Sequence, residues 1–492
     1  MKRLSPRYTT KTRIHTKQHT TIMKANKFIA GLLALSAAPL ASAATFEITG
    51  ATAFRRATIE AVNALYVNSA LPYSLGHNKS AATDFINADF LTFQGTISGL
   101  GATTVRLSFN GSIEGLRAIA QPGQSGVDGT NGDAYYIKDS SVTITPALNG
   151  AVNANQFITV NADPSTDTDM DRAVAEMAFS DTDVAISPYN PALFTGGSPG
   201  VLVFSLVSND GSGITNVTTQ QYNSLLKNGF MSKSLFTGLS EDQSKLVFCT
   251  GRNDGSGTRS SYLAEMGFGV AKPVQQYLVV SSTPDQVRAL QAVPAGGTND
   301  SNGIQSDGVQ LPSGSDIKNF NDFVAPIEQL FTSKSTVWGQ DVDGNGGAFS
   351  GSLLRGHMAM KGDAVRVFDA EGFDQFGATI SGVSLITWVS LNDAITARDG
   401  GANICAFNGV SLTVNPGKVL SAADKQKVYN GNYTAWNFQK FYRRPSADAN
   451  TVTLYNSVFS SVANGNLGVA GLKNTDMKVG RPLDGGVINP IF

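Results

Sequence analysis

The chain has 492 residues, of which 37 are basic and 38 acidic, so its formal net charge is -1 at pH 7. A nearly neutral chain with 15% charged residues gives no indication of a nucleic-acid groove or of a basic surface that binds membranes. The length predicts two or three lobes, and a hydrophobic content of 41% allows them a packed core.

The first 43 residues predict a secretory signal. A basic, an apolar and a small-residue stretch follow one another: Lys24–Lys27, Phe28–Leu40 and Ala41–Ala43. We therefore expect the mature chain to begin near Ala44 and to be periplasmic or secreted. Met23 is the expected true start, with an unusually long basic region as the alternative. No later apolar run has the roughly 18 to 20 residues of a membrane span.

The next elements repeat one order: a strand, a loop of small and hydroxyl residues, and a helix. We expect strands at 45–49, 104–109, 183–187 and 246–249, and helices at 55–66, 116–120 and 260–266. Because open α/β sheets bind ligands at the carboxyl ends of their strands, the loops after these strands are the candidate site.

Arg252 to Thr258 is the most informative of these loops. Its glycines allow a ligand to approach the backbone, and a helix that follows offers free N–H groups at its positive end. The Arg252 guanidinium suits a tetrahedral oxyanion, and Asp254 can orient it. The loop is therefore predicted to cradle an anion, and the alternative is a Ser/Gly-rich surface turn.

Residues typical of catalytic and metal centres are scarce. Only His77 and His357 belong to the expected mature chain, and neither has a partner at the spacing of a zinc site or a catalytic triad. Residues 341–346 resemble the opening of a calcium loop, but Ser352 stands where its bidentate Glu would be, so a glycine-rich turn is preferred. The two cysteines, Cys249 and Cys405, leave pairing open. We expect no metal, cofactor or catalytic residue.

The loops, in their order, resemble those of the phosphate-binding subunits of bacterial phosphate ABC transporters, which are periplasmic binding proteins of two lobes. The Arg-x-Asp-x-Ser-Gly-Thr loop of that family is matched in full at 252–258. Its first loop is matched loosely at 49–54 and its Gly-Ser-x-x-Gly loop at 111–115. Its Ala-Ser-Asp strand is matched in part at 183–187. The resemblance covers roughly residues 46–445.

The resemblance implies a set of ligand-binding residues contributed by both lobes. They are Thr52 or Ala53, Phe54 through its N–H, Ser112, Ser187, Arg252, Ser256, Gly257 and Thr258, with Asp254 orienting Arg252. This chain departs from the family at one position. Members of the family have an Asp that accepts a hydrogen bond from protonated phosphate, and Pro188 stands in its place here. Glu114, Asp181 and Asp183 are the candidates to replace it.

Other polar features of the chain remain open. Arg55, Arg56 and Arg259 lie beside the candidate loops and are interpreted as solvated arginines, with a more highly charged ligand as the alternative. Long polar stretches at 121–169 and 294–316 are either loops at the mouth of the cleft or decoration. The aromatic residues between Tyr433 and Tyr442 are interpreted as core.

The fold class expected is therefore α/β, a two-lobed periplasmic-binding-protein fold with mixed sheets, flanking helices and a ligand cleft. Lobe one is predicted at 44–204 plus 397–450 and lobe two at 205–396, with a C-terminal extension at 451–492. The expected function is monomeric, non-enzymatic binding of phosphate or a related oxyanion for an ABC-type transporter. The alternative is an exported surface or matrix protein that has changed or lost the ligand.

Overall fold

The structure is a computed structural model, and it describes residues 43–69, 71, 73–109, 111–120, 134–142, 158, 167–253, 255–272, 274–283, 286–292, 347–348, 351–358, 361–362, 364–369, 374–414, 419–465, 467 and 471–491. Residues 44–492 form one compact unit. The predicted signal segment up to residue 42, the calcium-like loop at 341–346 and the polar stretch at 294–316 lie outside the described residues.

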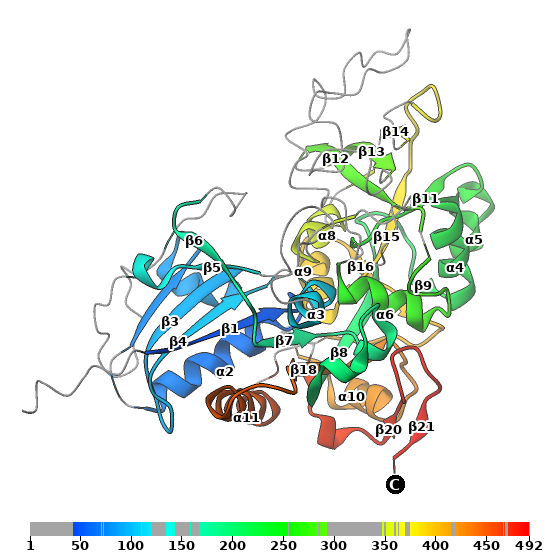
Figure 1. The fold of residues 1–492 in the computed structure, drawn as a ribbon. Helices are drawn as coiled ribbons and strands as arrows, with labels where there is room; N and C mark the ends of the chain where they lie inside the picture. The colour runs from blue at the N-terminus through cyan, green and yellow to red at the C-terminus, as the bar shows by residue number, and fades with distance from the viewer. Residues whose placement is uncertain are drawn as a thin grey trace, which may run out of the picture. The chain divides into compact units, whose positions relative to one another are not determined.

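The largest sheet in the described part of the chain is mixed and has twelve strands (Figure 1). Ten of them follow the order β10-β11-β15-β8-β18-β7-β1-β4-β3-β2, and β16 and β19 also pair with β8. Their bounds are β1 Ala44–Gly50, β2 Ser74–His77, β3 Phe90–Ile97, β4 Gly101–Ser108, β7 Met177–Ser180, β8 Thr195–Ser208, β10 Phe230–Ser232, β11 Leu246–Cys249, β15 Ser384–Ser390, β16 Asn403–Ile404, β18 Trp436–Arg443 and β19 Gly471–Leu472.

Parallel pairing brings the candidate loops to one end of their strands. Strand β1 pairs in parallel with both β4 and β7, and β11 pairs in parallel with β15. Parallel neighbours end at the same edge of a sheet, so the loops that follow β1, β4 and β7 share one edge. The other strand pairs of this sheet are antiparallel.

Strand β8 joins the two halves of the sheet order. Its first part, Thr195–Val203, pairs with β18, and its last part, Phe204–Ser208, pairs with β15. The strand is buried at every position from Pro199 to Ser208, which fits its largely apolar sequence. The predicted chain crossings near Phe204 and Thr396, and the lobe boundaries that depend on them, stay predictions.

Helices pack on the large sheet and on one another (Figure 1). Helix α2 contacts β3 and α11, α3 contacts β1 and β7, and α8 and α9 contact each other and β15. The bounds are α2 Arg55–Val67, α3 Ser112–Ala120, α4 Thr219–Asn228, α5 Ser234–Thr237, α6 Gly257–Glu265, α8 Gly351–Met358, α9 Leu391–Asp399, α10 Ala422–Tyr429 and α11 Ala449–Asn464.

Local sequence explains where such helices begin and end. Helix α4 starts with a capping box, in which the Thr218 hydroxyl accepts from Gln221 N at 3.2 Å and Thr218 N donates to Gln221 Oε1 at 2.8 Å. It ends at Gly229, which has a φ of 78°. Short 3-10 helices connect other elements: Ala82–Asn87, Asp139–Ser141, Val184–Ile186, Pro191–Leu193, Ser240–Asp242 and Asn474–Asp476.

Smaller sheets complete the described structure. Two antiparallel pairs are β5 Ala134–Ile137 with β6 Met170–Ala173, and β20 Val479–Gly480 with β21 Asn489–Pro490. Strands β9 Asn216–Val217 and β17 Ala406–Phe407 pair in parallel. A three-stranded sheet contains β12 Tyr277–Thr283, β13 Gln286–Ala292 and β14 Arg366–Phe368. Strand β5 shows that the polar stretch at 121–169 includes ordered structure.

The predicted α/β class, with a mixed sheet flanked by helices, is confirmed. The strand predicted at 183–187 is wrong, because Val184–Ile186 is a 3-10 helix and the strand is β7, Met177–Ser180. The aromatic residues Tyr433, Trp436 and Phe441 are buried in the core, as interpreted. Within the described residues, none of the helices has the length and apolar character needed to cross a membrane.

Candidate functional site

The loop after β11 leads directly into helix α6, as the sequence indicated. The helix begins at Gly257, three residues earlier than expected, with Ser256 as its N-cap. Gly257 and Thr258 are therefore in the first turn, where N–H groups have no partner within the helix and the dipole favours negative charge. This end of α6 is suited to binding an oxyanion.

A carboxylate already lies at this helix end. Asp181 follows strand β7, and its side chain accepts hydrogen bonds from the hydroxyls of Ser112 and, at 3.2 Å, of Thr258. A Cβ atom built on Gly257 would lie only 1.8 Å from Asp181 Oδ1, so the carboxylate sits directly against the backbone of α6. Three predicted ligand-binding residues thus surround one internal oxyanion. We call Ser112, Asp181, Gly257 and Thr258 the oxyanion cradle.

Further hydrogen bonds fix the backbone on both sides of the cradle. Ser112 Oγ accepts from Asp181 N at 3.2 Å, and Thr182 Oγ1 donates to Gly257 O at 3.0 Å. The Asp181 carbonyl accepts from Asn437 Nδ2 at 3.1 Å and from Ser261 Oγ at 3.3 Å. The loop after β7 and the first turns of α6 are therefore held as one rigid arrangement.

Two ionisable groups of the site, Asp181 and Arg252, are each only 2% exposed. Burial raises the pKa of Asp181 above its ordinary value, while the Ser112 hydrogen bond and the positive charge of Arg252 oppose that rise. Burial lowers the pKa of Arg252 to about 10, so the guanidinium stays charged at neutral pH. Attraction between this cation and a buried anion is stronger than it would be in water.

Arg252 is held by groups from distant parts of the chain. Its Nε donates to Ala348 O at 2.9 Å, and its own carbonyl accepts from Gln276 Nε2 at 3.0 Å and from Arg259 Nη1 at 3.4 Å. Arg259 is 2% exposed, so its interpretation as a solvated arginine is wrong. Its buried guanidinium supports the backbone of the loop Arg252–Thr258 at Arg252.

The remaining two flanking arginines are engaged locally. Arg55 pairs with Asp89, and Arg56 Nε lies 2.8 Å from Glu60 Oε1 on the exposed face of α2. The interpretation as a solvated arginine therefore fits Arg56, whereas Arg55 is mostly covered, with 19% of its side chain exposed.

Backbone hydrogen bonds link the end of β1 to the loop after β4, and the start of α3 to the loop Arg252–Thr258. Gly111 N donates to Gly50 O at 3.0 Å, and Ile113 N donates to Gly255 O at 3.1 Å. Gly111 has a φ of 121°, and a Cβ there would lie 2.7 Å from Gly255 O, so only glycine fits this approach. The loops after β4 and β11 are thus brought together beside the end of β1.

Other predicted site residues have different surroundings. Phe54 is buried and its ring faces Phe179 at 5.9 Å between centroids, while Thr52 and Ala53 are half-buried just before α2. The hydroxyl of Ser187 is used within its own turn, where it donates to Val184 O at 2.8 Å. Asp254 lies outside the described residues. The ligand roles of these residues remain predictions.

Asp181 is the cradle residue that the sequence resemblance did not place. The pattern put the end of the strand at Ser187, whereas β7 ends at Ser180 and Asp181 follows it at once. The signal was the short apolar run Met177–Phe179 before the pair Ser180-Asp181. Of the three acids considered in place of Pro188, Asp181 is the one whose side chain accepts hydrogen bonds from Ser112 and Thr258.

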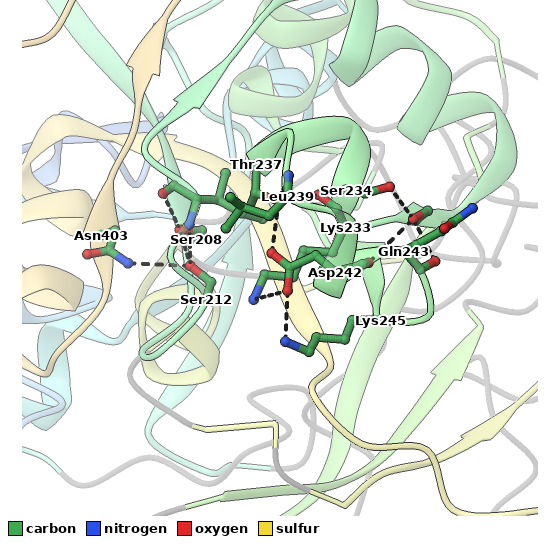
Figure 2. Close-up of polar contacts among 12 residues, drawn as sticks. Ser208, Ser212, Lys233, Ser234, Thr237, Leu239, Asp242, Gln243, Lys245 and Asn403 are labelled. Carbon is green, nitrogen blue, oxygen red and sulfur yellow. Dashed lines mark hydrogen bonds and ion pairs between the residues drawn. The ribbon is translucent and has the colours of Figure 1, made fainter.

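Figure 2 shows polar contacts elsewhere in the chain that join turns to neighbouring elements. Asp242 accepts from Lys245 Nζ and Thr237 Oγ1, both at 2.8 Å, which ties α5 to the turn that follows it. Ser208 and Ser212 hydroxyls lie 2.7 Å apart in the turn after β8. These contacts stabilise turns, and each of the carboxylate and hydroxyl groups named here has a partner.

Metal-ligand chemistry is not indicated in the described part of the chain, where no group of three or more His, Cys, Asp or Glu side chains is placed to hold an ion. Cys249 and Cys405 are both free and buried. Burial raises the pKa of Cys249 to about 12 and that of Cys405 to about 11, so neither is a reactive thiolate at neutral pH.

No family model and no curated protein matches the chain. Among solved structures, it is similar to an ABC-type phosphate transport receptor from Vibrio cholerae, with 12% identity, coverage of 85% of this chain and 95% of that chain, and a TM-score of 0.35. It is also similar to PstS from Borrelia burgdorferi, with 10% identity, coverage of 84% and 92%, and a TM-score of 0.30. A phosphate-binding protein from Stenotrophomonas maltophilia gives 12% identity, coverage of 85% and 83%, and a TM-score of 0.30. At these identities and TM-scores, function has to be argued from the chain's own residues.

Proposed function

We propose that this chain is an exported protein that binds phosphate or a related oxyanion at the oxyanion cradle. The observation that supports the proposal most directly is the surroundings of Asp181. Its carboxylate receives hydroxyl hydrogen bonds from Ser112 and Thr258 and lies against Gly257 at the start of α6. Groups that hold one oxyanion so closely have the donors and the dipole to hold another.

In the proposed complex, the Ser112 and Thr258 hydroxyls, each of which has one proton to donate, turn from Asp181 to the ligand oxygens. The ligand oxygens also accept hydrogen bonds from N–H groups at the start of α6. The buried guanidinium of Arg252 supplies the positive charge. Asp181 then accepts a hydrogen bond from a protonated phosphate oxygen and repels an anion that has no proton to donate. On this proposal, Asp181 provides the discrimination between phosphate and sulfate.

The wider role proposed is ligand capture for an ABC-type transporter in the periplasm or outside the cell. Two lobes, at 44–204 plus 397–450 and at 205–396, would close on the anion, with the protein acting as a monomer. Binding rather than catalysis is proposed because the cradle pairs its hydroxyls with a carboxylate and has no histidine among the residues described around it.

A second candidate is an exported surface or matrix protein in which the cradle has become structural. The observation that favours it is that Asp181 already uses the Ser112 and Thr258 hydroxyls. In addition, Ile113 N donates directly to Gly255 O, which joins two loops on either side of the cradle. Under this proposal Asp181 permanently fills the position of the ligand.

Thermal unfolding with added anions separates the two candidates. A ligand that binds only the folded protein stabilises it by about 2.7 kcal/mol at one hundred times its Kd. We expect phosphate to raise the Tm of the wild type, and Thr258→Val to lose most of that rise because it removes one hydroxyl donor. Thr396→Val, on the exposed face of α9, is the matched control and should respond like the wild type. If neither phosphate nor sulfate changes the Tm of the wild type, the second candidate is supported.

A further inference from the structure

The C-terminal hairpin contacts the cradle's supporting elements from outside the region that resembles the transport family. Strands β20 and β21 pair antiparallel, and Ile491 N donates to Lys478 O at 2.9 Å. The eight residues between the two strands, 481–488, are called the C-terminal loop. This loop packs against both helix α6 and the segment that follows Asp181.

Arg481 ties the C-terminal loop to the end of helix α6. Its Nη1 lies 2.7 Å from Glu265 Oε2, and its side chain is 1% exposed. The guanidinium also stacks over the Trp436 ring at 4.2 Å, and Nη2 donates to Thr434 O at 2.8 Å. A buried ion pair with these additional contacts is strongly destabilised when one partner is removed.

Backbone packing reinforces this contact. Gly485 has a φ of 69°, and a Cβ there would lie 2.2 Å from Ala264 O, in the last turn of α6. The loop therefore rests directly on the helix whose first turn forms one side of the cradle.

Asp484 ties the same loop to the other side of the cradle. It is 2% exposed, and its Oδ2 accepts from Asp183 N at 2.6 Å. Asp183 lies two residues after Asp181, and its own carboxylate is 2.7 Å from Lys440 Nζ. The backbone that carries Asp181 is therefore anchored to the C-terminal loop.

We infer that the C-terminal loop is a latch that holds Asp181 and the first turn of α6 at the correct separation. Arg481 and Asp484 are the positioning residues of this latch, and they act on the anion through α6 and through Asp183. The effect on ligand affinity rests on the proposed function, whereas the effect on the two segments does not. A C-terminal segment that looks like an addition to the fold is thereby assigned a role at the site.

Two measurements on the purified protein test the latch. Hydrogen exchange without any anion follows segments 181–187 and 257–266, and calorimetry follows phosphate affinity. The variants are Arg481→Gln, Glu265→Gln, their double mutant, Asp484→Ala and Asp484→Asn. Lys478→Gln is the matched control, because it removes an exposed cation from the same hairpin.

We expect Arg481→Gln and Asp484→Ala to speed exchange in both segments and to weaken phosphate binding at least tenfold. The double mutant Arg481→Gln/Glu265→Gln should lose no more exchange protection and no more phosphate affinity than either single variant, because the two side chains act together. Asp484→Asn should retain wild-type behaviour because its amide oxygen can still accept from Asp183 N. Lys478→Gln should change neither measurement.

Exchange that stays at the wild-type rate in both segments of Arg481→Gln and Asp484→Ala would overturn the latch. So would exchange that rises equally throughout the chain, because that result describes general destabilisation. If the wild type does not bind phosphate while the two segments respond as expected, the latch stands and the proposed function fails.

Discussion

The carboxylate of Asp181 lies so close to the backbone of Gly257 that a Cβ atom at residue 257 would come within 1.8 Å of Asp181 Oδ1. The same Cβ would lie 2.5 Å from Ser112 Oγ. Gly257 is therefore the residue that allows the loop after β7, the start of α3 and the start of α6 to meet.

Gly257→Ala should open the cradle. The added methyl group would displace Asp181, whose carbonyl is fixed by Asn437, and overpacking of this kind costs about 1 to 3 kcal/mol. We expect a lower Tm and a loss of most phosphate affinity, measured by thermal unfolding and calorimetry. Gly356→Ala is the control, because a Cβ at this helical position meets nothing within 4 Å. It should leave the Tm unchanged or raise it, and equal losses in both variants would contradict the packing argument.

The sequence was informative where a local pattern decides the structure. The apolar run before Arg252 became β11 and the segment after it became α6, because strand, glycine-rich loop and helix each have strong local signals. The helix predicted at 55–66 is α2, Arg55–Val67. The loops that precede α2 and α6 could therefore be placed at the ends of strands without a structure.

Residues 183–187 show where local pattern fails. Their short apolar run suggested a strand, but the Asp183 side chain accepts from Ala185 N at 2.9 Å and favours a turn instead. The choice of Asp181 among three acids depended on which one lies beside Thr258, a residue 77 positions away. The contacts of Arg481 and Asp484 are equally long-range, and no sequence pattern indicated them.

The half-buried carboxylate of Glu176 predicts how stability depends on pH. Glu176 Oε2 accepts from Glu47 N at 2.6 Å, and burial, followed by repulsion from Glu47, raises the pKa of Glu176 from 4.5 to about 8. The folded protein then holds a proton that the unfolded chain releases, so stability should fall as pH rises from about 4.5 to about 8. The expected contribution is on the order of 1 to 3 kcal/mol.

Glu176→Gln should remove this dependence. We expect the Tm of the variant to match the wild type near pH 5 and to exceed it near pH 9, because glutamine carries no charge to bury. Glu60→Gln, which breaks the exposed pair with Arg56, is the control and should leave the pH profile of the wild type intact. Parallel profiles for the wild type and Glu176→Gln would contradict the prediction.

The thiols make a further prediction. Cys249 and Cys405 are free and buried, and burial raises the pKa of each. Both should resist iodoacetamide in the native protein and both should react in guanidinium chloride, as counted by mass spectrometry. Labelling of either thiol under native conditions, or a mass two hydrogens lower after purification, would show that the cysteines are exposed or paired.

The most direct measurement is calorimetric titration of the wild type and of Asp181→Asn with phosphate and with sulfate at pH 7. The account predicts that the wild type binds phosphate and excludes sulfate. Asp181→Asn should bind phosphate more weakly and gain sulfate binding, because its amide can donate a hydrogen bond and carries no negative charge. A wild type that binds neither anion, or an Asp181→Asn variant with the wild-type preference, would contradict the role given to the cradle.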